Sequence, residues 1–278
     1  MYQVEMSSLS KLPEFSSESG DHRFVIVAPM YNASATLTRF FASIVAQSYK
    51  NWYIILIDDI SSRDEINREW QIISRWTQVI DDDYLPGNTS RLKVIWNDNK
   101  EWEVRNVLKG ISLCSESDII CRVDPDDALV DTDAFFILNE CYKSGVDAVW
   151  TQHRWGQSDR NISSYMPPGV DPYRFRWVSS HLKTFRKSLI TGVPWDNFLN
   201  MNGDVVRRAG DQAIYLPVLY RTEKRLFLPR VMYSYTIDEM GGAVYETDDA
   251  KFQKSEADFI RSRGYISSGP TWEEKISI

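Results

Sequence analysis

Four short runs of apolar residues alternate with helical patterns in the first half of the chain. The apolar runs cover residues 24–29, 52–57, 92–96 and 118–123. Between them, large apolar residues recur at helical spacing over residues 37–45, 65–79 and 101–113. Runs that are apolar throughout are typical of strands buried on both faces of a parallel sheet. The alternation therefore predicts an α/β protein with a doubly wound sheet and helices on both faces.

The fourth apolar run ends in a cluster of carboxylates at Asp124, Asp126 and Asp127. Ligands of open α/β sheets bind beyond the carboxyl ends of the strands, so chemistry is expected at this turn. Three carboxylates within four residues repel one another unless a cation joins them, and a divalent metal is the simplest candidate. The alternative is an acidic turn that caps the next helix through Asp126 or Asp127. The cluster alone does not separate the two.

No glycine occurs between Gly20 and Gly87, so a glycine-rich phosphate loop after either of the first two strands is excluded. A diphosphate bound to this sheet needs another source of positive charge, and a cation on Asp124 and Asp126 would supply it. The missing loop also weighs against a nucleotidyltransferase that forms sugar nucleotides. That class shares the sheet and the carboxylates but needs the loop after the first strand.

Neither a membrane span nor a secretion signal is apparent. No segment approaches the ~20 consecutive apolar residues that a membrane-spanning helix needs, and residues 1–20 lack the apolar core of a signal peptide. We therefore expect a soluble, cytoplasmic protein. The three cysteines, Cys114, Cys121 and Cys141, are odd in number and lack the spacing of a zinc site. They predict buried free thiols rather than disulfides.

The net charge of −7 is unevenly distributed along the 278 residues. Residues 151–230 contain 13 Lys and Arg against 6 Asp and Glu, so this part is basic and the remainder is acidic. Within it, residues 173–187 interleave basic with aromatic side chains. Such a segment suits an anionic partner that can stack, as nucleic-acid bases do. The alternative is that part of this charge serves a diphosphate and part is solvated surface.

Five short motifs occur in an order and spacing that resemble those of a known family. The motifs are VAPMYN at 27–32, SIVAQSY at 43–49, IILIDD at 54–59, Arg105-Asn106, and DPDD at 124–127. Together they resemble the GT-A glycosyltransferases of family 2, and ordered motifs are more specific than any one alone. The chain departs from the family at Ile60, where glycine is usual, in a slightly longer following loop, and at Val104, where alanine is common.

The resemblance implies the GT-A, or Rossmann-like, form of the doubly wound fold, with a mixed sheet. We expect an N-terminal extension over residues 1–22, a nucleotide-sugar-binding part over 23–150, an acceptor-binding and catalytic part of the same domain over 151–247, and a C-terminal helix and tail over 248–278. The patterns of the second half predict helices over 131–144, 213–220 and 249–263, strands over 148–152 and 225–235, a loop over 153–172, and a loosely ordered tail from 270.

The resemblance also implies a donor site at the carboxyl ends of the first strands. Contacts with the nucleotide or the donor are expected from Pro29, Tyr31, Asn32, Asp58, Asp59, Arg105, Asp124, Lys183 and Arg186. From the residues alone, Pro29 and Tyr31 are as well explained by strand termination and packing, and Arg105 by a charge on a helix surface.

The metal ligands implied by the resemblance are Asp124, Asp126 and His181, with Mn²⁺ or Mg²⁺ as the ion. Imidazole is a reasonable third ligand beside two carboxylates. A lone histidine is as readily explained by a structural role.

The catalytic base that the resemblance implies is Asp211, in the segment Gly210-Asp211-Gln212 at the start of a helical pattern. Aspartate is also a good N-cap, so the same residue is explained by capping that helix. Asp204 is the second candidate for the base.

The function implied is an inverting, metal-dependent transfer of a sugar from a nucleotide diphosphate donor, with a UDP-sugar as the default. Asp211 would take the proton from an acceptor hydroxyl, and the metal would neutralise charge on the leaving diphosphate. The acceptor is a glycan or another hydroxyl compound, or alternatively a modified base in DNA. The remaining alternative is a non-catalytic module that binds nucleotide-sugars, and the presence of both the Asp-rich turn and Asp211 weighs against it.

Overall fold

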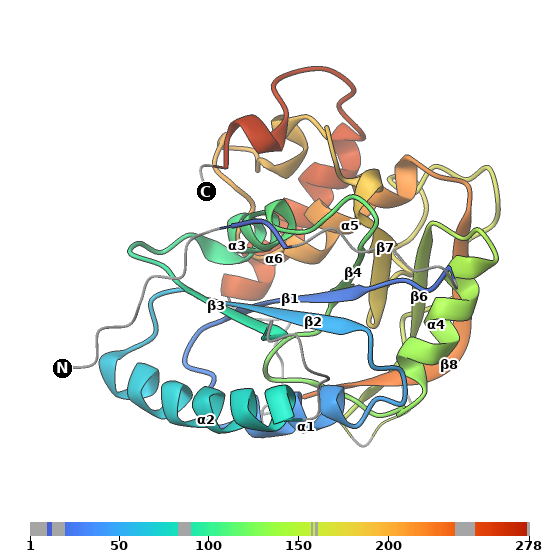
Figure 1. Ribbon diagram of the computed structural model, residues 1–278. Helices are drawn as coiled ribbons and strands as arrows, with labels where there is room; N and C mark the ends of the chain where they lie inside the picture. Colours follow the sequence, from blue (N-terminus) through green and yellow to red (C-terminus); the bar gives the residue numbers. More distant parts are fainter. Residues whose placement is uncertain are drawn as a thin grey trace.

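One mixed sheet with helices on both faces forms the body of the molecule (Figure 1). The computed structural model describes residues 10–12, 20–82, 90–156, 158, 161–236 and 248–276. Within these residues the sheet has eight strands in the order β3-β2-β1-β4-β7-β6-β8-β5. The predicted α/β class and the doubly wound mixed sheet are confirmed.

The first half of the chain supplies the parallel part of the sheet. Its strands are β1 (Phe24–Met30), β2 (Trp52–Asp58), β3 (Leu92–Trp96) and β4 (Ile119–Arg122). They are connected by α1 (Leu37–Val45), α2 (Arg63–Asp82) and α3 (Trp102–Ser112). The strand order reverses at β1, because β2 and β4 lie on its two sides and both are parallel to it. Such a switch point is where doubly wound sheets bind their ligands.

Beyond β4 the sheet continues on one side only, with three strands from the second half of the chain and the short strand β5. β7 (Lys183–Arg186) lies antiparallel between β4 and β6 (Ala148–Trp155). Next to β6 lies the parallel strand β8 (Arg225–Tyr235), and β5 (Ala128–Leu129) pairs antiparallel with β8. The two parts predicted for residues 23–150 and 151–247 therefore share one sheet. The exact partition of the chain stays a prediction.

Two cores flank the sheet. In Figure 1, α1 and α2 lie below the strands, while α3, α5 (Gly210–Tyr220) and α6 (Asp248–Arg263) lie above them. α4 (Ala134–Lys143) packs in the same core as α1. α3 lies very close to β1, because a Cβ atom at Gly110 would be 2.5 Å from Val27 Cγ1. This close contact holds the second half of α3 against β1.

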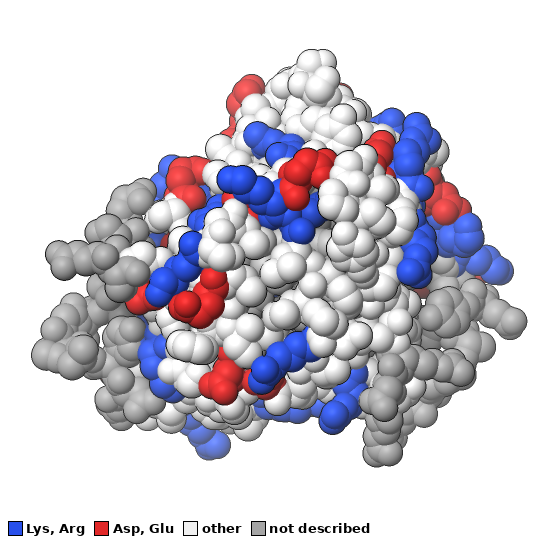
Figure 2. Space-filling model, turned by 90° about the vertical axis from the view of Figure 1, so that its right-hand side faces the viewer, with Lys and Arg blue, Asp and Glu red and all other residues white. Residues whose placement is uncertain are grey.

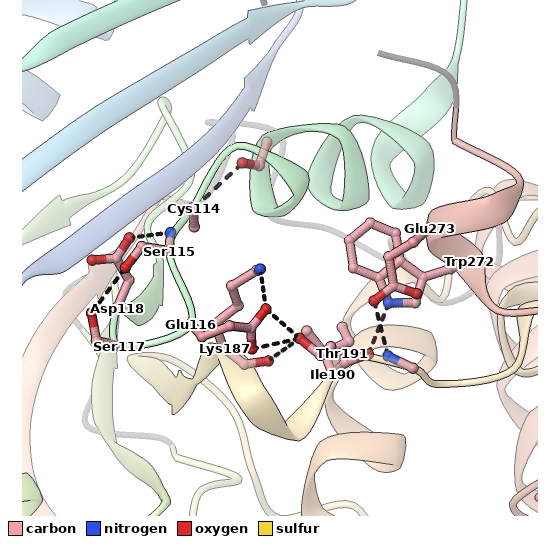
Figure 3. Close-up of polar contacts among 12 residues, drawn as sticks. Cys114, Ser115, Glu116, Ser117, Asp118, Lys187, Ile190, Thr191, Trp272 and Glu273 are labelled. Atoms are coloured by element: carbon pink, nitrogen blue, oxygen red, sulfur yellow. Dashed lines mark hydrogen bonds and ion pairs between the residues drawn. The ribbon is translucent and has the colours of Figure 1, made fainter. Parts of the chain in front are cut away.

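Several predicted boundaries change. β6 continues to Trp155, so the loop predicted from residue 153 begins later. β5 and β7 were not predicted. The end of the chain is packed rather than loosely ordered up to residue 276. There Trp272, in the short helix η4 (Trp272–Glu274), is fully buried and its Nε1 donates to the carbonyl of Ile190 at 2.8 Å (Figure 3).

Other expectations concern cysteines and membranes. All three cysteines are free, Cys114 and Cys121 are buried, and Cys141 is half-buried. No helix among the described residues is both long and apolar enough to cross a membrane. Most of the N-terminal extension predicted over residues 1–22 lies outside the described residues.

Candidate active site

The Asp-rich turn after β4 is tied to β8. Asp127 is buried, and its carboxylate accepts hydrogen bonds from the Tyr233 hydroxyl and the Thr236 amide, both at 2.7 Å. Asp126 is exposed, and its backbone carbonyl accepts from the Thr236 hydroxyl and from Arg39. Neither residue caps α4, whose N-cap is Asp133. The capping interpretation of this turn is therefore wrong.

A cluster of buried or half-buried charges surrounds Asp124. Arg122, the last residue of β4, donates from Nη2 to Asp124 Oδ1 at 2.9 Å and to Glu103 Oε1 at 3.2 Å. Lys183 at the start of β7 forms an ion pair with Asp211 in the first turn of α5. Arg122 and Lys183 are paired in register on neighbouring strands. The sheet thus brings the two cations and the three carboxylates together from four elements.

The charges of this cluster set the ionisation of Asp211. Burial would raise the pKa of its carboxyl, but the neighbouring Lys183 ammonium, His181 and Arg122 lower it well below the usual range. Asp211 is therefore ionised at neutral pH. Its role as N-cap is also excluded, because the N-cap of α5 is Ala209 and the Asp211 side chain pairs with Lys183.

Glu103 is a second carboxyl group of this cluster, and its pKa is shifted in the opposite direction from that of Asp211. Burial raises the pKa of Glu103 to about 7, and the Arg122 guanidinium limits the increase. The Glu103 carboxylate also explains the glycine before Asp211, since a Cβ atom at Gly210 would be 2.4 Å from Glu103 Oε2. Two carboxyl groups of different proton affinity thus lie side by side at the start of α5.

Five aromatic rings from β6, β8 and the residues before β7 line one side of this cluster. His181 stacks on Tyr233 with ring centroids 4.7 Å apart, and Tyr235 lies 5.4 Å from His181. The Trp155 ring is 5.6 Å from Tyr235, and His153 is 6.1 Å from His181. Alternate residues of a strand point to one face, which explains how two paired strands supply four of the rings. These five residues are called the aromatic ladder below.

His181 connects the aromatic ladder to the candidate base. Its Nε2 lies 3.7 Å from Asp211 Oδ2. Burial and the Lys183 ammonium lower the pKa of His181 to about 4, so the imidazole is neutral at physiological pH. Its Nδ1 is buried and has no hydrogen-bond partner among the described residues.

The predicted nucleoside residues meet at the ends of β1, β2 and β3. Tyr31 is 56% exposed, and the Lys100 ammonium lies 3.6 Å from the centroid of its ring. The amide of Asn32 donates to Ser61 Oγ at 2.7 Å. Pro29, the sixth residue of β1, is half-buried and pairs in register with Ile57 of β2. An aromatic face and a lysine thus border this corner of the sheet.

The two aspartates that end β2 are both buried, and they have different partners. Asp59 accepts the amides of Glu101 at 2.7 Å and Trp102 at 3.0 Å, so it anchors the start of α3. Asp58 accepts the amide of Ser61 at 3.1 Å, and its other oxygen has no hydrogen-bond partner among the described residues. Burial raises the pKa of Asp58. Of the two aspartates, Asp58 is therefore the one with a carboxylate oxygen that no described residue binds.

Ile60 adopts the backbone conformation of the glycine that the family usually has at this position. Its φ is 66°, in the left-handed region that β-branched residues rarely adopt. The departure from the family motif is thus one of side chain and not of backbone. The turn after β2 keeps the shape that the motif predicts.

The loop before α5 is fixed from the C-terminal helix. Glu256 on α6 is fully buried and accepts the backbone amides of Arg207, Arg208 and Ala209 at 2.8 to 3.2 Å. It also accepts the side-chain amide of Asn200 at 3.0 Å. One buried carboxylate therefore positions the chain that leads into Asp211.

The three predicted metal ligands do not form one site. No three His, Cys, Asp or Glu side chains in the described ranges are grouped closely enough to hold a metal. Asp124 is paired with Arg122, whereas His181 stacks on Tyr233 and faces Asp211. Mg²⁺ is usually held by one or two carboxylates together with substrate phosphates. The turn thus suits a cation shared with a bound diphosphate, without His181.

Three other residues that the sequence predicted for the donor site or as the base lie away from this cluster. Arg186 is at the opposite end of β7, where it donates to the carbonyls of Tyr142 and Val146. The Arg105 guanidinium lies 5.3 Å from the centroid of the Trp195 ring. Asp204 is exposed and pairs with Arg207 at 3.7 Å. The structure brings none of the three to Asp211 and Asp124.

Three of the five cations in the basic segment over residues 173–187 are paired with carboxylates, whereas Arg174 and Arg176 are exposed. Lys183 and Lys187 are buried and paired with Asp211 and Glu116, and Figure 3 shows Lys187 pointing toward Glu116. Arg186 is paired with Asp147 at 3.2 Å. Three of the segment's cations therefore already have carboxylate partners within the protein. Lys and Arg also lie interspersed with Asp and Glu on the face in Figure 2.

Sequence reasoning missed Glu103, Arg122 and the aromatic ladder apart from His181. The sequence could have indicated a role for Arg122, because a charged residue inside a short buried strand requires a partner. The local sequence pattern around Glu103 does not indicate its role, since its partners come from β4 and α5.

The fold and the ends of its strands define a GT-A α/β protein with a candidate nucleotide corner, an Asp-rich turn and a separate carboxylate at the start of α5. Residues 25–194 match the family model described as glycosyl transferase family 2. The match covers more than half of the chain, so the chain belongs to this family. No curated protein sequence matches it.

Solved structures with the same fold include two glycosyltransferase-type proteins. TarS 1–349 of S. aureus matches with a TM-score of 0.58 at 15% identity, over 77% of this chain and 60% of that chain. Its complex with UDP-GlcNAc matches with a TM-score of 0.54 at 14% identity, over 78% and 59%. The mannosyltransferase PcManGT of Pyrobaculum calidifontis, in complex with GDP-Man and Mn²⁺, gives 0.55 at 15%, over 89% and 66%. The chain thus spans about 60% of the length of the TarS structure.

Proposed function

We propose that this protein transfers a sugar from a nucleotide diphosphate donor to an acceptor hydroxyl, with inversion at the anomeric carbon and Asp211 as the general base. The observation that carries the proposal is the placement of Asp211. It is an ionised carboxylate, 36% exposed, in the same charge cluster as Arg122, which pairs with the Asp-rich turn. A carboxylate in this place can accept the proton of a hydroxyl that attacks from the side opposite the diphosphate.

Lys183 would link donor binding to the strength of this base. While Lys183 is paired with Asp211, the aspartate is a weak proton acceptor because its pKa is far below neutrality. A diphosphate near Arg122 and Lys183 competes for the same ammonium group. When the ammonium turns toward the diphosphate, the proton affinity of Asp211 rises. The base would therefore become effective only after the donor has bound.

The donor would lie along the ends of β1 to β4. We assign the nucleoside to the corner with Pro29, Tyr31, Asn32 and Asp58, and the diphosphate to the Asp-rich turn. Asp124 and Asp126 would hold Mn²⁺ or Mg²⁺ jointly with the diphosphate, and the ion would neutralise charge on the leaving group. A UDP-sugar is the proposed donor, supported by the similarity to a TarS structure in complex with UDP-GlcNAc.

For the acceptor, we favour a glycan or another neutral hydroxyl compound over a nucleic acid. The nucleic-acid alternative depended on the basic and aromatic side chains of residues 173–187. Lys183, Arg186 and Lys187 are paired with carboxylates, and Tyr173 is buried. These pairings leave Arg174 and Arg176 as the exposed cations of the segment for contacts with phosphates.

The test is a thermal-shift titration with UDP, GDP, CDP and dTDP, each with and without Mn²⁺. A ligand that binds only the folded state raises the melting temperature by mass action. We expect UDP to give the largest shift, and we expect the shift to require Mn²⁺ and to be lost in Asp126→Ala. Asp258→Ala, an exposed aspartate on α6, is the matched control. No shift with any nucleotide would contradict the proposed function.

A further inference from the structure

The aromatic ladder runs from the interior of the protein toward solvent. His153, His181 and Tyr233 are buried, Trp155 is half-buried, and Tyr235 is 36% exposed. At the inner end, His181 lies beside Asp211, with the two side chains 3.7 Å apart. The outer rings of Trp155 and Tyr235 are 5.6 Å apart and inclined by 50°. A ligand on the outer rings would therefore be guided toward the candidate base.

The ladder lies on the opposite side of the charge cluster from the nucleoside corner. The corner is formed at β1, β2 and β3, whereas the ladder belongs mainly to β6 and β8. β4 and β7, which carry Arg122 and Lys183, separate these strands in the sheet. Tyr233 contacts the Asp-rich turn through Asp127, so a diphosphate at the turn would lie beside the inner part of the ladder. The outer rings of Trp155 and Tyr235 are the part of the ladder left for the second substrate.

Four carboxylates of the charge cluster and the Asp-rich turn lie near Tyr235. Burial raises the pKa of Tyr235 well above its usual range, and the carboxylates Asp127, Asp124, Asp211 and Asp126 raise it further. A neutral ligand with hydroxyl groups would be accepted, because carboxylates are good hydrogen-bond acceptors.

We propose that Trp155 and Tyr235 form the binding site of the acceptor, and that the acceptor is a neutral sugar whose ring stacks on these side chains. The C–H groups on one face of a pyranose carry partial positive charge, and the face of an aromatic ring carries partial negative charge. The remaining edge of the sugar presents hydroxyls to the carboxylates. The two outer rings are inclined by 50°, so each presents its own face to a sugar unit. This inference rests on the proposed function and specifies its acceptor.

Ligand-observed saturation-transfer NMR tests the inference on the full chain in the presence of UDP and the diamagnetic ion Mg²⁺. The probes are glucose, N-acetylglucosamine and the disaccharides cellobiose and maltose, with a single-stranded thymidine hexanucleotide as the anionic comparison. We expect saturation of ring C–H protons for at least one disaccharide, reduced about fivefold in Trp155→Ala and in Tyr235→Ala. Tyr235→Phe keeps the ring and should retain the signal. Tyr165→Ala removes a tyrosine that is 59% exposed elsewhere and should leave the signal unchanged.

The outcomes separate this inference from the proposed function. The shift in melting temperature caused by UDP is measured on every variant and reports both folding and the donor site. If UDP binds and no sugar gives a signal, or the signal survives in both alanine variants, the acceptor assignment is wrong and the donor proposal stands. A signal from the hexanucleotide that exceeds the sugars would also overturn it. If the wild-type protein does not bind UDP, the proposed function itself fails.

Discussion

Lys183 on β7 and Asp211 in the first turn of α5 form an ion pair in which the lysine side chain is 2% exposed and the aspartate side chain 36% exposed. The pair connects the strand beside the Asp-rich turn to the helix that carries the candidate base. Because the buried ammonium needs a counter-charge, it holds the Asp211 carboxylate in place. The exposed part of the carboxylate still faces a substrate.

The first prediction concerns Asp211→Asn. Asparagine keeps the size of the side chain and an oxygen that accepts from Lys183, but it cannot take up a proton. We expect transfer to fall by about 10²- to 10⁴-fold, the usual contribution of a general base. Donor affinity should change little. Release of UDP from a UDP-sugar in the presence of an acceptor measures the rate, and the thermal shift with UDP measures binding.

Asp204→Asn is the matched control for this experiment, because Asp204 was the second candidate and is exposed. Its transfer rate should stay near that of the wild type. A rate that survives in Asp211→Asn and falls in Asp204→Asn would reverse the assignment. A loss in Glu103→Gln but not in Asp211→Asn would transfer the role to Glu103, whose pKa of about 7 also suits a base.

The second prediction concerns Glu256, which accepts three backbone amides and one side-chain amide in a fully buried position. Glu256→Ala leaves these donors unsatisfied and should lower the free energy of unfolding by about 3 kcal/mol, measured by urea denaturation. Glu256→Gln retains one acceptor oxygen and should cost about half as much. Asp258→Ala, on the same helix but exposed, should have little effect. Equal stability of Glu256→Ala and the control would contradict this role.

The parallel half of the fold was predictable because its strands are apolar throughout and alternate with helical patterns. β7 was not, because Lys183 and Lys187 in its neighbourhood suggest an exposed segment. Their partners, Asp211 and Glu116, are distant in the sequence, and no local pattern indicates such pairs. The buried position of Trp272 was not predictable for the same reason, since its partner, the carbonyl of Ile190, is distant in the sequence.

The candidate site was predictable where a motif coincides with the end of a strand. The Asp-rich turn follows β4 directly, so its place at the carboxyl edge followed from the strand alone. The contacts of Asp124 were not predictable from the sequence. They depend on Arg122 and Glu103, which come together only because α3 packs against the sheet. The three predicted metal ligands are not grouped among the described residues, because the motif does not encode how His181 stacks on Tyr233.

The third prediction concerns Ile60, whose φ of 66° is costly for a β-branched residue. Ile60→Gly should relieve about 1–2 kcal/mol of backbone strain and lose about 0.5–1 kcal/mol through the greater freedom of the unfolded chain. We expect unchanged or slightly higher stability in thermal denaturation. Val130→Gly, at another exposed apolar residue, should instead destabilise the protein, since the described non-glycine residues with positive φ are Asn32, Ile60 and Trp102. Similar losses in both variants would show that Ile60 is not strained.

The fourth prediction is a pH dependence due to Glu69 on α2. This side chain is fully buried, and burial together with the charge of Asp58 raises its pKa above 4.5. A carboxyl whose pKa is raised in the folded state stabilises the fold fully below its unfolded pKa, and this contribution is lost as pH rises through the folded pKa. Glu69→Gln keeps an acceptor for the Ala33 amide, now 2.7 Å from Glu69 Oε1, and cannot ionise.

The melting temperature of Glu69→Gln should therefore exceed that of the wild type at about pH 8, and the difference should shrink as the pH falls toward about 4. Glu140→Gln, at a half-exposed glutamate, should show no such trend. A difference that widens on acidification would mean that the pKa of Glu69 is lowered in the folded state.

The last prediction distinguishes a metal site formed by Asp124, Asp126 and the diphosphate from one that also includes His181. If Asp124 and Asp126 hold the cation together with the diphosphate, His181→Phe should keep the Mn²⁺-dependent thermal shift with UDP. Phenylalanine preserves the stack on Tyr233 and removes both ring nitrogens, and stacked aromatic pairs of this kind contribute about 1 kcal/mol. Asp126→Ala should abolish the Mn²⁺ dependence in the same titration. Loss of that dependence in His181→Phe, with folding intact, would show that the imidazole turns away from Asp211 to bind the ion when the donor is present.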